Sequence, residues 1–329
     1  MAVLIIIILL ALSFDFINGF HDTANAIATC VSTRALPLRT AILMAAGMNF
    51  LGAILFTGVA ETIAGGIVDL HLVHNGTLVL CAAILTAIIW NLLTWYFGIP
   101  SSSSHALIGA LIGAALAEGG INAIHFFSVT KIVVVLIIAP FLAIGVGYVV
   151  FKLIKWLMRG VTGAYHINFV IRKIQIFTAA FQAFSHGSND AQKSMGIITM
   201  ALVSFGVLDT MTVPHWVQIA CALAMCLGTS IGGWRIIKTV GTQITKLKPI
   251  SGVAADLSAS LVIQIATHLH LPVSTTHVIS SAIVGVGAAN RLKGVKWKTA
   301  RNMVTAWFIT IPITMGIAFG IVLLLSLVL

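Results

Sequence analysis

The chain has 329 residues, of which 59% are hydrophobic and only 8% are charged. Together with a mean hydropathy of +1.10, this composition excludes a soluble globular domain and indicates a protein surrounded by lipid. The net charge of +10 does not indicate nucleic-acid binding, because the 18 Lys and Arg residues lie mostly in short clusters between apolar segments.

Apolar segments of about 20 residues, the length that crosses a hydrocarbon core, recur from one end of the chain to the other. The first run, 2–12, is expected to belong to a retained helix, because it lacks the basic flank and cleavage site of a signal peptide. The segments between are too short for a soluble domain. The predicted membrane segments are 2–31, 41–60, 77–97, 105–117, 129–151, 174–208, 216–234, 250–267, 277–290 and 303–328.

Basic residues cluster on alternate connections, at Arg34 and Arg39 and within 152–173, 235–248 and 291–301. The positive-inside rule therefore predicts that these loops are cytoplasmic, and that the acidic loops and both termini lie outside. Five predicted segments precede the central basic loop and five follow it. Because five is odd, the two halves should have opposite orientations in the membrane.

The predicted fold is therefore an all-α polytopic membrane protein with two inverted-topology repeats. The first repeat would comprise residues 1–151 and the second residues 174–329, joined by a cytoplasmic basic linker at 152–173. Broken helices and re-entrant hairpins are expected within each repeat, for the reasons that follow.

Two polar motifs occur in both halves in the same order. Asn18–Asn25 (Asn-Gly-Phe-His-Asp-Thr-Ala-Asn) corresponds to His186–Lys193 (His-Gly-Ser-Asn-Asp-Ala-Gln-Lys), and Pro100–His105 corresponds to Pro272–His277. Both pairs recur at an offset of about 170 residues, which is the signature of an internal repeat.

Each copy of the first motif places an acid, Asp22 or Asp190, within an apolar segment. A charge at mid-bilayer costs about 2.5 to 3.5 kcal/mol, so each carboxylate needs a partner or an ion. The neighbouring Gly and Asn residues favour a break in the helix, where exposed backbone groups can coordinate an ion. An interhelical polar contact that only holds the bundle together is the alternative.

The second motif predicts half-helices. Segment 105–117 has only about 13 residues, or roughly 20 Å, which is too short for a hydrocarbon core of about 30 Å. Segment 277–290 is similarly short. The free amide groups of such half-helices, with the hydroxyls beside them, can donate to an anion, although simple helix capping would also explain the hydroxyls. The candidate substrate donors are Ser101, Ser102, Ser103, Ser104, Ser274, Thr275 and Thr276.

Other polar residues near these motifs have open roles. Lys193 either balances Asp190, three residues earlier, or reaches a bound anion. The histidines of the motifs could donate to substrate, relay protons or act as structural donors. Coupling-ion candidates are Asp15, Asn18, Asp22, Asn49, Asn189, Asp190 and Asp256, and proton-relay candidates are His21, His105, His186 and His277.

At these motifs the chain resembles the inorganic phosphate transporter (PiT) family, and Phe16–Ala26 and Ser185–Lys193 are similar to its bacterial low-affinity Pit-type permeases. The resemblance implies a phosphate permease with inverted repeats and re-entrant hairpins, often dimeric, in the cell (inner) membrane. It places the phosphate and coupling ion among Asp22, Asn25, Ser101 to Ser104, Asp190 and Ser274 to Thr276.

The chain departs from the family pattern in two places: Gln192-Lys193 replaces a common Ala-Asn, and Asn49 replaces the acid of animal relatives. Coupling to protons, coupling to sodium and carriage of a metal–phosphate complex therefore remain open, and no cofactor is expected beyond such ions. The alternatives are a sulfate or other oxyanion permease, a passive channel, and an intramembrane enzyme using Ser104 and His105. The enzyme is disfavoured because the chain has no nucleophile-elbow or zinc-helix motif.

Overall fold

The computed structural model describes residues 1–70, 72–160 and 164–327. These residues form helices joined by loops, with a single isolated β-bridge between Val68 and Ile124. The helices of the first half are α1 (Ala2–Ser32), α2 (Leu38–Ala53), α3 (Gly58–Gly66), α4 (Gly76–Phe97), α5 (Ser103–Gly119) and α6 (Phe126–Leu157). Those of the second half are α7 (Ala164–Asp190), α8 (Gln192–Ser204), α9 (His215–Ile231), α10 (Trp234–Gln243), α11 (Pro249–His268), α12 (Thr275–Asn290) and α13 (Trp297–Ser326).

The structure confirms an all-α protein with several apolar helices long enough to cross a membrane. In the described part of the chain, α1, α4, α6, α11 and α13 meet that requirement individually, and the bent pairs α2–α3 and α9–α10 raise the number of candidate spans from five to seven. The prediction of ten spans counted α5 and α12, which have only 17 and 16 residues. It also treated three broken segments as continuous.

Those three segments are 41–60, 216–234 and 174–208. The first is bent by 66° between α2 and α3, and the second by 71° between α9 and α10. At the second bend Gly232 has φ +75°, a left-handed conformation that stops a helix at little cost for glycine. The third segment divides at Ala191 into α7 and α8.

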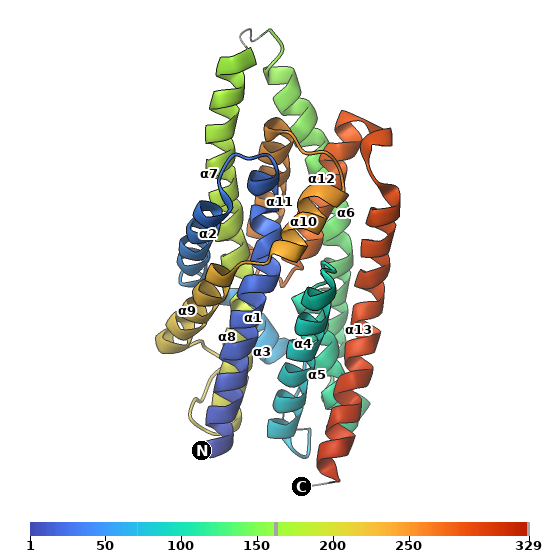
Figure 1. Cartoon of the computed structure of the whole chain (residues 1–329). Coiled ribbons are helices and arrows are strands. Elements are labelled where there is room, and N and C mark those ends of the chain that lie inside the picture. The colour runs from blue at the N-terminus through green and yellow to red at the C-terminus, as the bar shows by residue number, and fades with distance from the viewer. Residues whose placement is uncertain (71, 161–163, 328–329) are drawn as a thin grey trace.

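The short helices belong to two hairpins, α4–α5 and α11–α12, as the Pro-hydroxyl motifs predict. In Figure 1 the first hairpin occupies the lower half of the molecule and the second the upper half. Their tips meet inside the protein, where the Ser104 hydroxyl donates to the carbonyl oxygen of Val273 at 2.9 Å. The two hairpins therefore enter from opposite ends and end at a common depth.

Helices of one half pack mainly on helices of the other. Helix α1 packs on α9 and α2 on α7, while α5 packs on α13 and α12 on α6. Glycines allow the backbones to touch: a Cβ at Gly19 or Gly228 would overlap the α9 or α1 backbone, and one at Gly52 or Gly187 would overlap the α7 or α2 backbone. Such small-residue contacts hold helices together where lipid removes the hydrophobic driving force.

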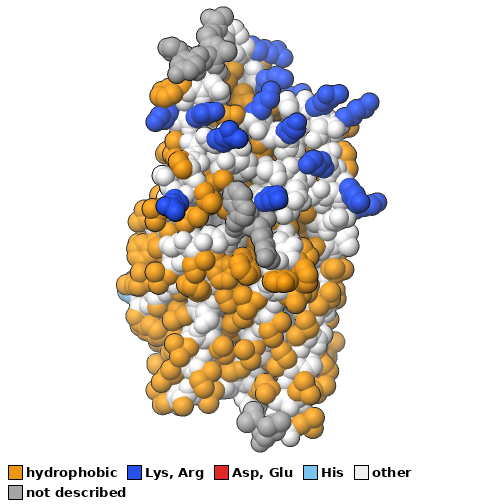
Figure 2. All heavy atoms as spheres, in the orientation of Figure 1, with side chains coloured by type: hydrophobic (Ala, Val, Ile, Leu, Met, Phe, Trp, Pro, Cys, Tyr) orange, Lys and Arg blue, Asp and Glu red, His pale blue; other side chains and the backbone are white. Residues whose placement is uncertain are grey.

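The directions of the helices are those expected for inverted halves. Both termini lie at one end of the molecule, and α1 and α7 run in opposite directions (Figure 1). Lys and Arg side chains gather at the other end, above an apolar band (Figure 2). Within the predicted linker 152–173, residues up to Leu157 end α6 and residues from Ala164 begin α7, while 161–163 lie outside the described residues. The division into repeats 1–151 and 174–329 remains a prediction.

Candidate functional site

The polar motifs of both halves meet at the centre of the molecule, beside the two hairpin tips. Asp22 lies on α1 and Asp190 is the last residue of α7, while Ser103 and Thr276 lie in the first turns of α5 and α12. All four side chains are buried. The sequence reasoning therefore identified side chains that the fold brings together from four separate helices.

The predicted helix breaks at the two acids occur at only one of them. Helix α1 continues without interruption past Asp22, whereas α7 ends at Asp190 and α8 begins at Gln192. At that break the side-chain amide of Gln192 donates to the carbonyl oxygen of Ser188 at 2.5 Å. In a continuous helix, the backbone amide of Gln192 would donate to this same oxygen. The expectation of a break at Asp22 was wrong: α1 is helical from Ala2 to Ser32, and the neighbouring Gly19 serves close packing on the α9 backbone instead.

Asp22 accepts hydrogen bonds from hydroxyls of both hairpins. Its Oδ2 accepts from the Ser103 hydroxyl at 2.6 Å, and its Oδ1 accepts from the Thr276 hydroxyl at 2.9 Å and lies 2.7 Å from His21 Nδ1. Asn25, one turn further along α1, donates to the Thr276 hydroxyl at 2.9 Å. Asp22 is thus the point at which α1 holds both half-helix N-termini.

Asp190 has a charged partner instead. Its Oδ2 lies 2.8 Å from Lys193 Nζ, accepts from Asn18 Nδ2 at 3.2 Å and lies 3.4 Å from His186 Nε2. Lys193 also donates to the Ser103 hydroxyl at 2.7 Å. Of the two roles left open for Lys193, the structure shows the pair with Asp190, and it also brings Lys193 to the hydroxyl motif of the first hairpin. Contact with a bound anion stays a prediction.

Several buried oxygens at this centre lack a donor. Among the described residues, Asp190 Oδ1, Asn18 Oδ1, Asn25 Oδ1 and Thr275 Oγ1 have no hydrogen-bond partner. Buried polar atoms are rarely left in this state, so an unpaired set points to a ligand or ion. One ligand atom from each of Asp22, His186 and Asp190 lies within 4.8 Å of the others, a separation suited to a shared cation.

The remaining hydroxyls have mostly structural partners. Ser102 and Ser274 accept from the amides of His105 and His277, at 3.1 and 3.3 Å, as helix N-caps. Ser101 donates to Thr94, which also lies 3.1 Å from His21 Nε2. The capping explanation therefore holds for Ser102 and Ser274, while Ser103 and Thr276 are the hydroxyls that contact the acid.

Two buried asparagines bond to residues around the central aspartates. Asn189 Nδ2 donates to Thr267 at 2.9 Å, and its Oδ1 accepts from the Val273 amide at 3.2 Å, which fixes the tip of the second hairpin. Asn49 donates to Thr23 at 2.8 Å, and its Oδ1 lies 3.0 Å from His186 Nδ1. Asn49 is thus one contact removed from Asp190, through His186, whereas Asn189 contacts only the second hairpin and its base.

Gln192 has a role that sequence reasoning missed. Its side-chain oxygen accepts from the amides of Val59 and Ala60, at 2.7 and 3.0 Å, and so caps the N-terminus of α3. The glutamine was noticed only as a departure from the family pattern. The capped helix lies more than 130 positions away in the chain, so the local sequence carries no signal for this contact.

Four of the predicted residues do not join the aspartates. Asp256 accepts from Thr29 at 2.6 Å, and Asp15 lies beside Ser194 and Cys221. The rings of His105 and His277 lie 4.5 Å apart and face a separate cavity, where His277 stacks on Trp307. These residues remain candidates for proton or ion relay, but they are not ligands of the central site.

Comparison with known proteins agrees with this geometry. Residues 18–318 match the model of the Phosphate transporter family. The chain is 56% identical over 311 residues to a probable low-affinity inorganic phosphate transporter of Bacillus subtilis (strain 168), covering 94% of this chain and 93% of that protein. It is 46% identical to a protein of the same description from Rhizobium meliloti (strain 1021), covering 93% and 91%.

Among solved structures, a protein described as the sodium-dependent phosphate transporter superposes with a TM-score of 0.91 at 27% identity, over 100% of both chains. The relatives and this structure are transporters rather than enzymes, as expected. The match extends through both copies of both motifs, and the chain accordingly belongs to the phosphate transporter family and is a multi-pass membrane protein.

Proposed function

We propose that this protein is a secondary active transporter that takes up inorganic phosphate by symport with a cation across the cell (inner) membrane. The observation that carries the proposal is the continuous chain of contacts Asp190–Lys193–Ser103–Asp22–Thr276. It joins one ammonium, two carboxylates and the N-termini of two half-helices at a single buried point, with contributions from both halves of the chain.

Phosphate would bind where donors from both hairpins converge. The first-turn amides of α5 and α12 have no partner within their own helices, and helix N-termini favour anions. Ser103 and Thr276 now donate to Asp22 and could turn to a phosphate oxygen, while Lys193 supplies a positive charge at the same hydroxyl. Thr275 offers a further buried hydroxyl without a partner among the described residues.

The charges of the site require a cation to accompany phosphate. With neutral histidines, the two aspartates and Lys193 leave one net negative charge. A phosphate anion would add to it, and like charges at low dielectric repel one another by several kcal/mol. A bound cation near Asp22 and Asp190 removes this conflict and couples phosphate movement to the cation gradient.

Three kinds of cation would fit beside the two acids: a sodium ion, a proton or a divalent metal. The structural neighbour is described as sodium-dependent, and the unpaired oxygens of Asn18, Asn25 and Asp190 would suit a sodium ion. Asp22, His186 and Asp190 could equally hold a proton or a divalent metal carried with phosphate. Each of these choices predicts a different driving gradient.

Alternating access would use the two hairpins, whose tips close the site between opposite ends of the molecule. Inverted repeats give a transporter two related conformations that face opposite sides of the membrane. A homodimer is also proposed from the family resemblance, and the site does not depend on it because all the contacts above lie within one chain.

Uptake of labelled phosphate into proteoliposomes tests the proposal, with proton, sodium and magnesium gradients imposed one at a time. We expect accumulation above equilibrium with one cation gradient and none without it, and little competition by sulfate. The Asp22→Asn protein, reconstituted at equal density, is the matched control. Uptake that ignores every gradient would indicate a channel, and full competition by sulfate would indicate a general oxyanion permease.

A further inference from the structure

A cavity lies away from the central aspartates, on the outer side of the bundle between α6 and α13. Its volume is about 540 Å³, within the usual range for small-molecule sites. Pro140 of α6 and Pro312 of α13, the prolines inside these two long helices, both line it. Phe141 and Phe308 at its walls are exposed on the isolated chain, so the cavity faces the surrounding lipid.

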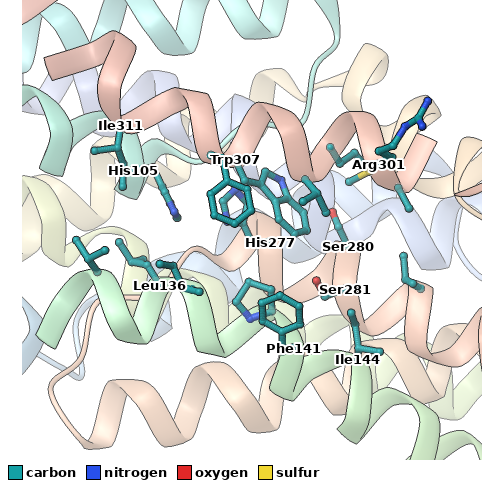
Figure 3. Close-up of a pocket in the computed structure, with 18 of the residues that line it drawn as sticks. His105, Leu136, Phe141, Ile144, His277, Ser280, Ser281, Arg301, Trp307 and Ile311 are labelled. Carbon is teal, nitrogen blue, oxygen red and sulfur yellow. The ribbon is translucent and has the colours of Figure 1, made fainter. Parts of the chain in front are cut away.

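The polarity of the cavity changes along its length (Figure 3). Arg301 lies at one end, Ser280 and Ser281 come next, then His277 and Trp307, and the far end holds Leu136, Ile311 and the ring of His105. Arg301 is exposed and lies near the start of α13, in the basic cluster 291–301. The other walls are almost entirely aliphatic and aromatic.

The polar atoms inside the cavity have no partners in the described structure. The hydroxyls of Ser280 and Ser281, the indole nitrogen of Trp307 and Nε2 of His277 are buried and form no hydrogen bond. A purely apolar occupant would leave all four unpaired, at a cost for each buried group. The occupant should therefore carry acceptors about midway along the cavity.

We propose that this cavity binds one anionic glycerophospholipid. The phosphate would pair with Arg301, the ester oxygens would accept from Ser280 and Ser281, and one acyl chain would run past Phe141 towards Leu136 and Ile311. From Trp297 to Pro312 the cavity follows α13 for roughly 22 Å at 1.5 Å per residue, which is the scale of a chain reaching beyond the bilayer midplane. Basic pockets on the cytoplasmic side of membrane helices suit anionic headgroups.

The deep end of the cavity touches the helices that form the central site. His105 and His277 lie in the first turns of α5 and α12, three residues after the capping hydroxyls of Ser102 and Ser274. A chain seated there would support both half-helices from the lipid side. This gives the bilayer a direct contact with the elements that hold Asp22.

Tryptophan fluorescence provides the test, because Trp297 and Trp307 line the cavity. The full-length protein is reconstituted in phosphatidylcholine containing a low fraction of dibrominated phosphatidylglycerol or, in parallel, dibrominated phosphatidylcholine. Bromine quenches only on close approach, so we expect stronger quenching by the anionic lipid. Trp307→Phe should remove at least half of that excess.

Charge and volume variants separate the cavity from the general lipid surface. Arg301→Gln should abolish the preference for the anionic lipid, whereas Arg291→Gln, an exposed residue of the same basic cluster that does not line the cavity, should keep it. Ala300→Phe, which fills the mouth of the cavity, should abolish quenching of Trp307 by either lipid.

Two results would overturn the proposal. One is equal quenching by both lipids in the unmodified protein, or an unchanged preference in Arg301→Gln. The other combines two observations: neither lipid quenches Trp307, and a single cysteine placed at Phe308 crosslinks efficiently in a variant that lacks the four native cysteines. Together they would show that a second copy of the chain covers this face.

Discussion

The two copies of the acidic motif show how a duplicated sequence can acquire two different electrostatic roles. Asp22 lies in an unbroken helix and receives hydrogen bonds from hydroxyls of both hairpins. Asp190 lies at a helix break and pairs with Lys193 only three residues away. The second acid thus carries its own counter-charge, while Asp22 contacts two hydroxyls and the ring of His21.

This difference identifies which acid should depend on an external cation. Asp190 and Lys193 together are close to neutral, so their pair can persist through the transport cycle. Asp22 is held by donors that phosphate would also attract, and its charge is uncompensated once they turn away. We expect substitutions at Asp22 to affect coupling and substitutions at Asp190 and Lys193 to affect stability as well.

The largest effect is expected for Asp22→Asn, which should abolish gradient-driven phosphate accumulation. The amide keeps the shape and some hydrogen bonding but lacks the charge that would hold the cation. Phosphate exchange at equal concentrations should be less affected than accumulation, and both are measured in the same proteoliposomes. Normal accumulation by this variant would show that the carboxylate has only a structural role.

Asp190→Asn should likewise abolish accumulation, but here a loss of stability is expected too. Removing one member of a buried ion pair costs about 3 to 5 kcal/mol because the other charge is left unpaired. Lys193→Met should be destabilised to a similar extent, and the double variant Asp190→Asn, Lys193→Met should recover most of the thermal stability in detergent. A double variant as unstable as the singles would argue against the pair as the origin.

Ser103→Ala should reduce phosphate uptake about tenfold or more, because hydrogen bonds to charged groups contribute about 1.5 to 3 kcal/mol. Ser103 contacts both Lys193 and Asp22, whereas its neighbour Ser104 donates to the Val273 carbonyl. Ser104→Ala is therefore the matched control, with a smaller effect on the apparent affinity for phosphate. Equal losses in the two variants would place the substrate elsewhere.

The smallest effect is expected for Gln192→Ala, which removes the cap from α3 without touching either acid. Loss of a helix cap costs typically about 1 kcal/mol. The melting temperature in detergent should fall modestly while the cation dependence of uptake stays unchanged. A changed cation dependence would mean that the helix break beside Asp190, and not only α3, depends on this glutamine.

Much of the fold follows from patterns visible in the chain. Apolar length, the position of the basic clusters and the repeated Pro-hydroxyl motifs predicted membrane helices and two hairpins. The bend between α2 and α3 did not follow, because both helices are apolar and only a distant partner, Gln192, shows where the helix starts again. At the bend between α9 and α10, Gly232 and Gly233 were a local signal that the predicted span 216–234 passed over.

The sequence singled out most of the residues that meet at the centre, but it did not show their partners. Duplication selected Asp22, Asp190 and the hydroxyl motifs, and the three-residue spacing made the Asp190–Lys193 pair one of two roles considered for Lys193. The bond from Lys193 to Ser103 joins positions 90 residues apart, and no local periodicity reports it. Asp15 and Asp256 were grouped with the central acids because sequence shows that an acid lies in the membrane but not which acids lie together.

The glycine contacts between the halves have a mechanical consequence. At Gly19 and Gly228, and again at Gly52 and Gly187, two backbones touch with no side chain between them. These points cannot move apart without opening a void or together without overlap, whereas the helices can still turn about them. A rocking motion would therefore turn about these contacts. Gly19 and Gly187 lie within one turn of Asp22 and Asp190, and Gly228 and Gly52 face them from the neighbouring helices. Pivots so close to the acids would let the ends of the helices swing widely while the carboxylates themselves hardly move.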